Sequence, residues 1–230
     1  MKIVCIHGQN HKGNTWHTAY ELLKNINCEK EVTEFFLPRD LPHFCSGCCL
    51  CLQKRENCPY WSQKEPIMAA ILQCDLLVIT TPTYCMMPSA PLKSFFDLFF
   101  TNWLSHKPYG EMYGKRAVVI STAAGAGAKK ATRPVANTLS YWGIPKVYQY
   151  GLAVNAKDWE TMPEKKKTRL CRDMATLGHK LSTDKKPSIG LKTRFMFWLF
   201  AGMQKSSWGA APEEREYWQQ QGWLDGQKPW

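Results

Sequence analysis

Two short, unbroken runs of apolar residues constrain the fold of this chain more than any other feature. They occupy residues 76–79 and 117–120. An unbroken apolar run is typical of a strand that is covered on both faces, as the central strands of a parallel sheet are. We therefore predict central parallel strands over residues 75–81 and 116–122.

Strands and helices alternate strictly around these two runs. Short apolar or β-branched segments predict three further strands, and a segment with helical features follows each of the five strands. Because neighbouring parallel strands need crossover connections, this alternation predicts an α/β, doubly wound sheet of five parallel strands with helices on both faces. The further strands are expected at 2–7, 31–37 and 146–152, and the helices at 16–26, 65–73, 89–104, 128–142 and 163–182.

The predicted core ends well before the chain does. We expect one α/β domain over residues 1–185 and a C-terminal helical and aromatic extension over residues 186–230. Within the extension, residues 195–200 form an apolar run in a basic surround, which suits either an anionic membrane surface or packing on the core or on a dimer mate. Because the run lacks a polar face, we favour packing and do not expect contact with a membrane surface.

Charge and cysteine content narrow the class of protein. The formal net charge is +11, which suits nucleic acid, an anionic membrane or an anionic small molecule. No zinc finger, RNP motif or basic-aromatic array occurs, so we expect no nucleic-acid partner. Ten cysteines without an export signal predict a reducing, cytoplasmic location.

A polar loop joins the first predicted strand to the first predicted helix. It spans residues 8–15 and contains Lys12, Asn14 and Thr15. Backbone N–H groups and the helix dipole favour an anion at such a position, and these side chains add a cation, hydrogen-bond donors and a cap. The spacing is neither that of the dinucleotide fingerprint nor that of the P-loop, so the alternatives are another phosphate site and an ordinary capped loop.

This loop resembles the G-S-x-R-x-G-N-[ST] segment of the flavodoxin-like NAD(P)H-dependent FMN reductase and iron-sulfur flavoprotein families. Gln9 stands where those families usually have serine, and His11 where arginine is common. Residues 81–97 resemble the S-P-x-Y and S-x-x-L-K-x-F-x-D pattern of the same families, and residues 121–127 resemble their third flavin-contacting loop. The resemblance covers about residues 1–150.

The resemblance implies a flavodoxin-like fold with strand order 2-1-3-4-5 and FMN as cofactor. It implies an enzyme that moves hydride from NAD(P)H through FMN to a small acceptor such as a quinone or flavin, with no dedicated catalytic side chain and commonly as a homodimer. The alternatives are an electron carrier that serves a protein partner and a binding module without flavin. The implied FMN contacts are Gln9, His11, Lys12, Asn14 and Thr15 on the first loop, Pro82, Thr83, Tyr84 and Cys85 on the second, and Thr122, Gly125 and Gly127 on the third.

Four cysteines follow a C-x2-C-x2-C-x6-C spacing: Cys45, Cys48, Cys51 and Cys58. Thiolates at this spacing can converge on a [4Fe-4S] cluster, and the arrangement resembles that of iron-sulfur flavoproteins. The alternatives are a plain cysteine loop, which we favour, and a zinc site or redox disulfide.

Overall fold

The protein is described by a computed structural model that covers residues 1–183, 187–206 and 211–230. Its parallel strands form one sheet in the order β2-β1-β3-β5-β6. A two-residue strand, β4, pairs antiparallel with the end of β3. Without β4 the order is 2-1-3-4-5, so the predicted topology is confirmed. The strands are β1 (Lys2–His7), β2 (Glu31–Phe36), β3 (Leu76–Tyr84), β4 (Met87–Pro88), β5 (Arg116–Ala123) and β6 (Lys146–Ala153).

The two apolar runs lie at the centre of this sheet, as predicted. β3 and β5 pair in register from Leu76 and Arg116 to Pro82 and Thr122. All eight residues of β5 are buried. Helices on both faces exclude water from these strands, which is why their sequences need no polar alternation.

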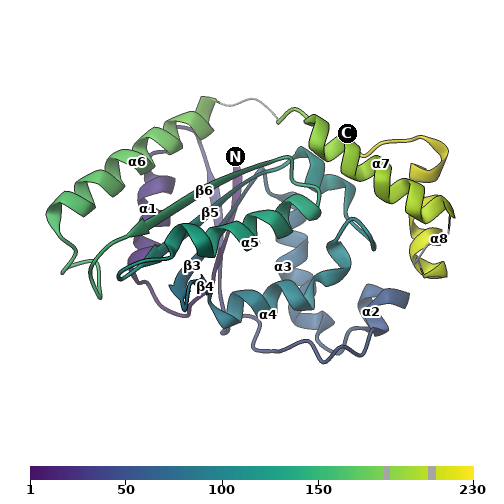
Figure 1. The fold of residues 1–230 in the computed structure, drawn as a ribbon, viewed down its shortest axis with the longest axis horizontal. Coiled ribbons are helices and arrows are strands. Elements are labelled where there is room, and N and C mark those ends of the chain that lie inside the picture. The colour runs from purple at the N-terminus through teal and green to yellow at the C-terminus, as the bar shows by residue number, and fades with distance from the viewer. Residues whose placement is uncertain (184–186, 207–210) are drawn as a thin grey trace.

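Helices cover both faces of the sheet (Figure 1). One face packs on the buried side chains of α1 (Asn14–Lys24) and α6 (Glu164–Thr183). The other packs on α3 (Trp61–Gln73), α4 (Ala90–Leu98) and α5 (Ala128–Tyr141). Alternate residues of each strand point to opposite faces, so each central strand contributes to both apolar clusters.

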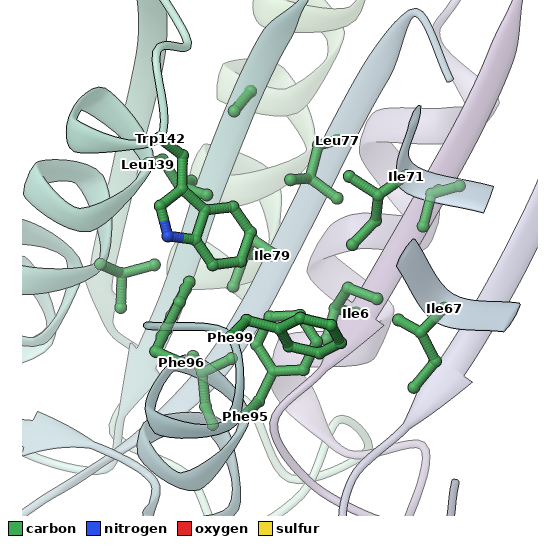
Figure 2. Close-up of a cluster of buried hydrophobic side chains, with 14 of the residues drawn as sticks. Ile6, Ile67, Ile71, Leu77, Ile79, Phe95, Phe96, Phe99, Leu139 and Trp142 are labelled. Carbon is green, nitrogen blue, oxygen red and sulfur yellow. The ribbon is translucent and has the colours of Figure 1, made fainter. Parts of the chain in front are cut away.

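Aromatic side chains fill the second cluster (Figure 2). The Trp142 ring centroid lies 5.4 Å from that of Phe96 and 6.1 Å from that of Phe95. Trp142 and Phe95 are almost completely buried. Side chains of this size dominate the apolar area removed from water, so this cluster fixes α4 and α5 against the sheet.

Two predicted helix boundaries are wrong. The helix predicted over residues 65–73 starts earlier, because α3 begins at Trp61 and contains Pro66 in its interior. The extra turn carries Lys64, which is buried with its ammonium group 5.2 Å from the centroid of the Phe99 ring. The helix predicted to reach residue 104 ends at Leu98 and is followed by a short 3-10 turn.

The remaining helices lie in the cysteine-rich segment, between α4 and β5, and in the extension. The elements are α2 (Leu50–Gln53), α7 (Leu191–Ser206) and α8 (Pro212–Gln220), with 3-10 turns η1 (Arg55–Asn57), η2 (Phe100–Asn102), η3 (Gly110–Gly114) and η4 (Trp223–Asp225). The domain boundary predicted at 185 and 186 falls at residues outside those described and stays a prediction. No helix among the described residues is long and apolar enough to cross a membrane.

The extension packs on the main domain through a third apolar cluster. Phe197 of α7 and Trp218 of α8 stack with ring centroids 5.3 Å apart, beside Tyr113 of the main domain. The Trp218 indole donates a hydrogen bond of 2.8 Å to the His106 carbonyl. The prediction that the apolar run packs on the core therefore holds for Phe197, which is 5% exposed.

Strand β6 lies very close to the start of α5 at Gly151. A Cβ atom at Gly151 of β6 would lie 2.6 Å from the backbone nitrogen of Lys129, at the start of α5. Gly151→Ala is expected to lower the free energy of unfolding by about 1–3 kcal/mol, because backbone atoms cannot move aside cheaply. Urea unfolding measures this, and Gly114→Ala is the control, since a Cβ there meets nothing within 4 Å. Equal midpoints for the two variants would contradict the packing described.

Candidate functional site

A cavity of about 470 Å³ lies at the carboxyl ends of the central strands. Crevices at this edge are where open α/β sheets bind ligands. The three predicted loops meet in it, together with a fourth loop that follows β6. The lining residues are Gln9, His11, Gly13, Asn14, Thr15, Pro82, Thr83, Tyr84, Thr122, Ala123, Ala124, Val154, Ala156 and Lys157.

The first loop is held from behind by the chain around Ser89. The Gly8 amide donates to the Thr80 carbonyl at 2.7 Å, and the Ser89 hydroxyl donates to the Gly8 carbonyl at 2.6 Å. A Cβ at Gly8 would lie 2.7 Å from the Ser89 oxygen, so a glycine is needed for this approach. Ser89 precedes α4, the helix that was predicted over residues 89–104, and its side chain makes no cap hydrogen bond.

Asn14 and Thr15 begin α1 and point into the crevice. The hydroxyls of Thr15 and Thr122 are 2.7 Å apart, which ties the first loop to the third. The Asn14 amide nitrogen donates to the Ala156 carbonyl at 3.4 Å, while its Oδ1 is buried and accepts no hydrogen bond from any described residue. A buried acceptor without a donor is costly, and a ligand hydroxyl would satisfy it.

Lys12 lies apart from the cavity that the sequence assigned to it. Its ammonium group sits 4.6 Å from the centroid of the Trp16 ring, and it lines a separate groove between α1 and β2. The lysine that lines the cavity is Lys157, on the loop after β6. Lys157 was not predicted as a site residue, although it lies just beyond the fifth predicted strand, at the edge of the sheet where ligands bind.

Gln9 and His11 both line the cavity, and they also shape the loop. The Gln9 side-chain amide donates to the His11 carbonyl at 3.1 Å. A Cβ at Gly13 would lie 2.8 Å from that amide nitrogen, so the loop closes tightly around a glycine. The first residues of α1 line the cavity, and the N–H groups of a first helical turn favour an anion.

The second loop is a β-hairpin, which we did not predict. The strand expected to end at residue 81 continues to Tyr84 and pairs with β4, Tyr84 opposite Met87. Cys85 and Met86 form the turn with φ of 50° and 66°, a backbone region that is costly for residues other than glycine. Pro82, Thr83 and Tyr84 line the cavity, whereas Cys85 is exposed on the turn and does not.

The second and third loops share a chain of buried hydroxyls. The Ser121 hydroxyl donates to the Thr81 carbonyl at 2.8 Å and lies 2.8 Å from the Thr83 hydroxyl. Thr81 in turn accepts from the Ser89 amide at 2.9 Å. These bonds cross three strand ends, so the cavity walls are fixed relative to one another.

Of the three contacts predicted on the third loop, Thr122 lies at the cavity itself and Gly127 lies against the hairpin. Gly127 caps α5 with φ of 91°, and a Cβ there would collide with Met86 of the hairpin. Gly125 faces open space and is not part of the lining. Gly127 therefore supports the cavity through the hairpin, and Gly125 makes no contact that a side chain would disturb.

A buried histidine lies directly beneath the first loop. His7 is 1% exposed, with Nε2 2.9 Å from a Glu34 oxygen and Nδ1 2.9 Å from the Thr80 hydroxyl. Burial lowers the pKa of His7, against the opposing effect of Glu34. The neutral ring donates from Nε2 to the carboxylate and accepts from Thr80, so it links β2 to β3 below the loop.

The cysteine segment forms a second, much smaller cavity of about 20 Å³. Cys45, Cys48, Cys49, Cys51 and Cys58 all line it, and all ten cysteines of the chain are free thiols. Burial raises the pKa of the Cys51 thiol. Among the described residues, no three cysteine, histidine or acidic side chains are arranged to hold a metal ion. The space accepts about one water molecule, so in this arrangement the thiols do not fit a cluster.

Comparison with known proteins matches residues 1–158 to the family of NADPH-dependent FMN reductases. An iron-sulfur flavoprotein of Archaeoglobus fulgidus is 29% identical over 161 residues, which cover 67% of this chain and 70% of the relative. An azoreductase structure from Bacillus anthracis superposes with a TM-score of 0.61 at 13% identity, covering 78% of this chain and 99% of that one. An FMN-dependent NADH-azoreductase from the same species, in complex with FMN, gives 0.60 at 13% identity, covering 80% and 100%. The two structures establish the fold.

The Ser89 hydrogen bond can be tested by its removal. Ser89→Ala leaves the buried Gly8 carbonyl without its donor and is expected to cost about 1–3 kcal/mol of unfolding free energy. The control is Ser62→Ala, because Ser62 is exposed on α3. Urea unfolding compares the two variants. Equal stability would show that Ser89 does not hold the first loop.

Proposed function

This chain belongs to the NADPH-dependent FMN reductase family, and we propose that its strand-end cavity holds FMN for hydride transfer from a nicotinamide to a small acceptor, a quinone or a free flavin. The observation that carries the proposal is the convergence of the three motif-bearing loops on one cavity. A volume of about 470 Å³ is in the range of cofactor pockets.

The residues present suit FMN at each part of the molecule. The start of α1, with His11 and Lys157 nearby, offers N–H donors and positive charge to the phosphate. The unsatisfied Asn14 Oδ1 would accept from a ribityl hydroxyl. Pro82, Ala123 and Ala124 give the ring system small or apolar walls. FMN, when bound, supplies the hydride acceptor and the redox chemistry.

In this proposal the protein binds FMN, orients its ring system and excludes water from it. Of the described residues that line the cavity, His11, Tyr84 and Lys157 carry titratable side chains, and no two of them form a hydrogen-bonded acid-base pair in the structure. We propose that backbone N–H groups of the loop after β5, which lines the cavity, stabilise negative charge on the reduced cofactor. We therefore propose no catalytic side chain. The homodimer and the cytoplasmic location stay predictions.

A second candidate is an electron carrier with a [4Fe-4S] cluster, serving a protein partner. Similarity to a protein named an iron-sulfur flavoprotein favours it, together with the C-x2-C-x2-C-x6-C spacing of the cysteines. Cys45, Cys48, Cys51 and Cys58 are the proposed ligands. Because the described thiols are not arranged to hold a metal, we derive no electron-transfer step through them.

Anaerobic stopped-flow absorbance separates the two functions. FMN-loaded protein mixed with NADPH is expected to lose its flavin absorbance at about 1–10³ s⁻¹ and to regain it when a quinone is added. Iron and sulfide are measured on the same preparation. Slow bleaching by NADPH, fast response to reduced ferredoxin and four irons per chain would overturn the first candidate in favour of the second.

A further inference from the structure

Helix α7 has two apolar faces, and among the described residues only one of them is covered by packing. Phe197 and Ala201 are buried against the third apolar cluster. On the outside, Leu191 is 85% exposed, Phe195 59% and Trp198 70%. Large apolar side chains gathered on one exposed helix face mark an interaction surface.

The outward residues form a continuous stripe. Leu191, Phe195 and Trp198 follow one another at intervals of four and three, which places them along one line of the helix. Leu199, 42% exposed, widens the stripe. The Phe195 and Trp198 rings lie 6.2 Å apart, so they form one apolar patch.

The charges on α7 all have the same sign. Lys192, Arg194 and Lys205 are exposed, and the helix contains no acidic residue. By helical spacing, Lys192 lies on one side of the stripe and Arg194 and Lys205 on the other. An apolar stripe with tryptophan and flanking cations is the pattern of a helix that lies in a membrane interface.

We propose that the outer face of α7 binds an anionic lipid surface, with the stripe among the acyl chains and the cations at the headgroups. Charge complementarity selects this occupant. A two-fold contact between copies would place the same cationic patch against itself, with no acid on α7 to offset it. The chain's net charge of +11 adds a long-range attraction to the same surface.

This surface is separate from the proposed FMN site. Figure 1 shows α7 together with α8 at one end of the molecule, away from the β3–β4 hairpin at the cavity. Changes on the outer face of α7 therefore leave the cavity residues untouched. Lipid binding and flavin chemistry can fail independently of each other.

Vesicle sedimentation tests the proposal on the full chain. The protein is expected to pellet with phosphatidylcholine vesicles that contain phosphatidylglycerol, and at least tenfold less with phosphatidylcholine alone. L191Q/F195Q/W198Q should reduce partition to anionic vesicles at least tenfold. K192Q/R194Q/K205Q should reduce it and flatten its dependence on salt. The matched control is Tyr20→Gln, which removes an aromatic that is 50% exposed on α1 and should change nothing.

Three results would overturn the proposal. The wild type could stay in solution with both kinds of vesicle, or L191Q/F195Q/W198Q could bind anionic vesicles as well as the wild type does. Sedimentation velocity provides the third, because self-association that the same variant abolishes would show that a second copy covers the face. Unfolding midpoints establish that each variant is folded. If L191Q/F195Q/W198Q does not fold, Trp198→Gln alone takes its place.

Discussion

Ser89 joins the first and second loops of the cavity through two hydrogen bonds. Its hydroxyl donates to the Gly8 carbonyl, and its amide donates to the Thr81 hydroxyl. Thr15 and Thr122 extend the connection to the third loop. All of these bonds join protein groups to one another, so the chain itself connects the walls of the cavity. A site built in this way loses less entropy on binding than one that must first order its loops.

The sequence carries enough information to predict the sheet and the loops at its carboxyl edge. Apolar runs identify buried strands because a polar side chain is costly to bury between two helix layers unless it finds a hydrogen-bond partner. The direction in which a loop side chain points cannot be predicted from an apolar pattern. Lys12 was assigned to the cavity from its place in the loop, yet it lies over Trp16 in the neighbouring groove. Lys157 lines the cavity from a loop that carried no recognised motif.

The hairpin was not predicted, and a binding role for the outer face of α7 was considered but not favoured. Pairing of β4 with β3 involves two residues and a turn of Cys85 and Met86, which are not the residues that such turns usually use. For the apolar run in the extension, packing was favoured over an anionic membrane surface, since a run apolar on all sides gives no indication of which side is covered. The structure shows Phe197 inside and Trp198 outside. The protein therefore has two candidate binding surfaces, and neither depends on the other.

The central claim is that this cavity grips the phosphate end of FMN with residues of the α1 start and the β6 loop. Calorimetric titration of FMN into flavin-free protein tests it most directly, with Lys157→Ala compared against Lys12→Ala. We predict that Lys157→Ala weakens binding about tenfold, equivalent to about 1.4 kcal/mol, and that Lys12→Ala stays within about twofold of the wild type. A wild type that takes up no FMN, or a Lys12→Ala variant that loses more affinity than Lys157→Ala, would contradict the account.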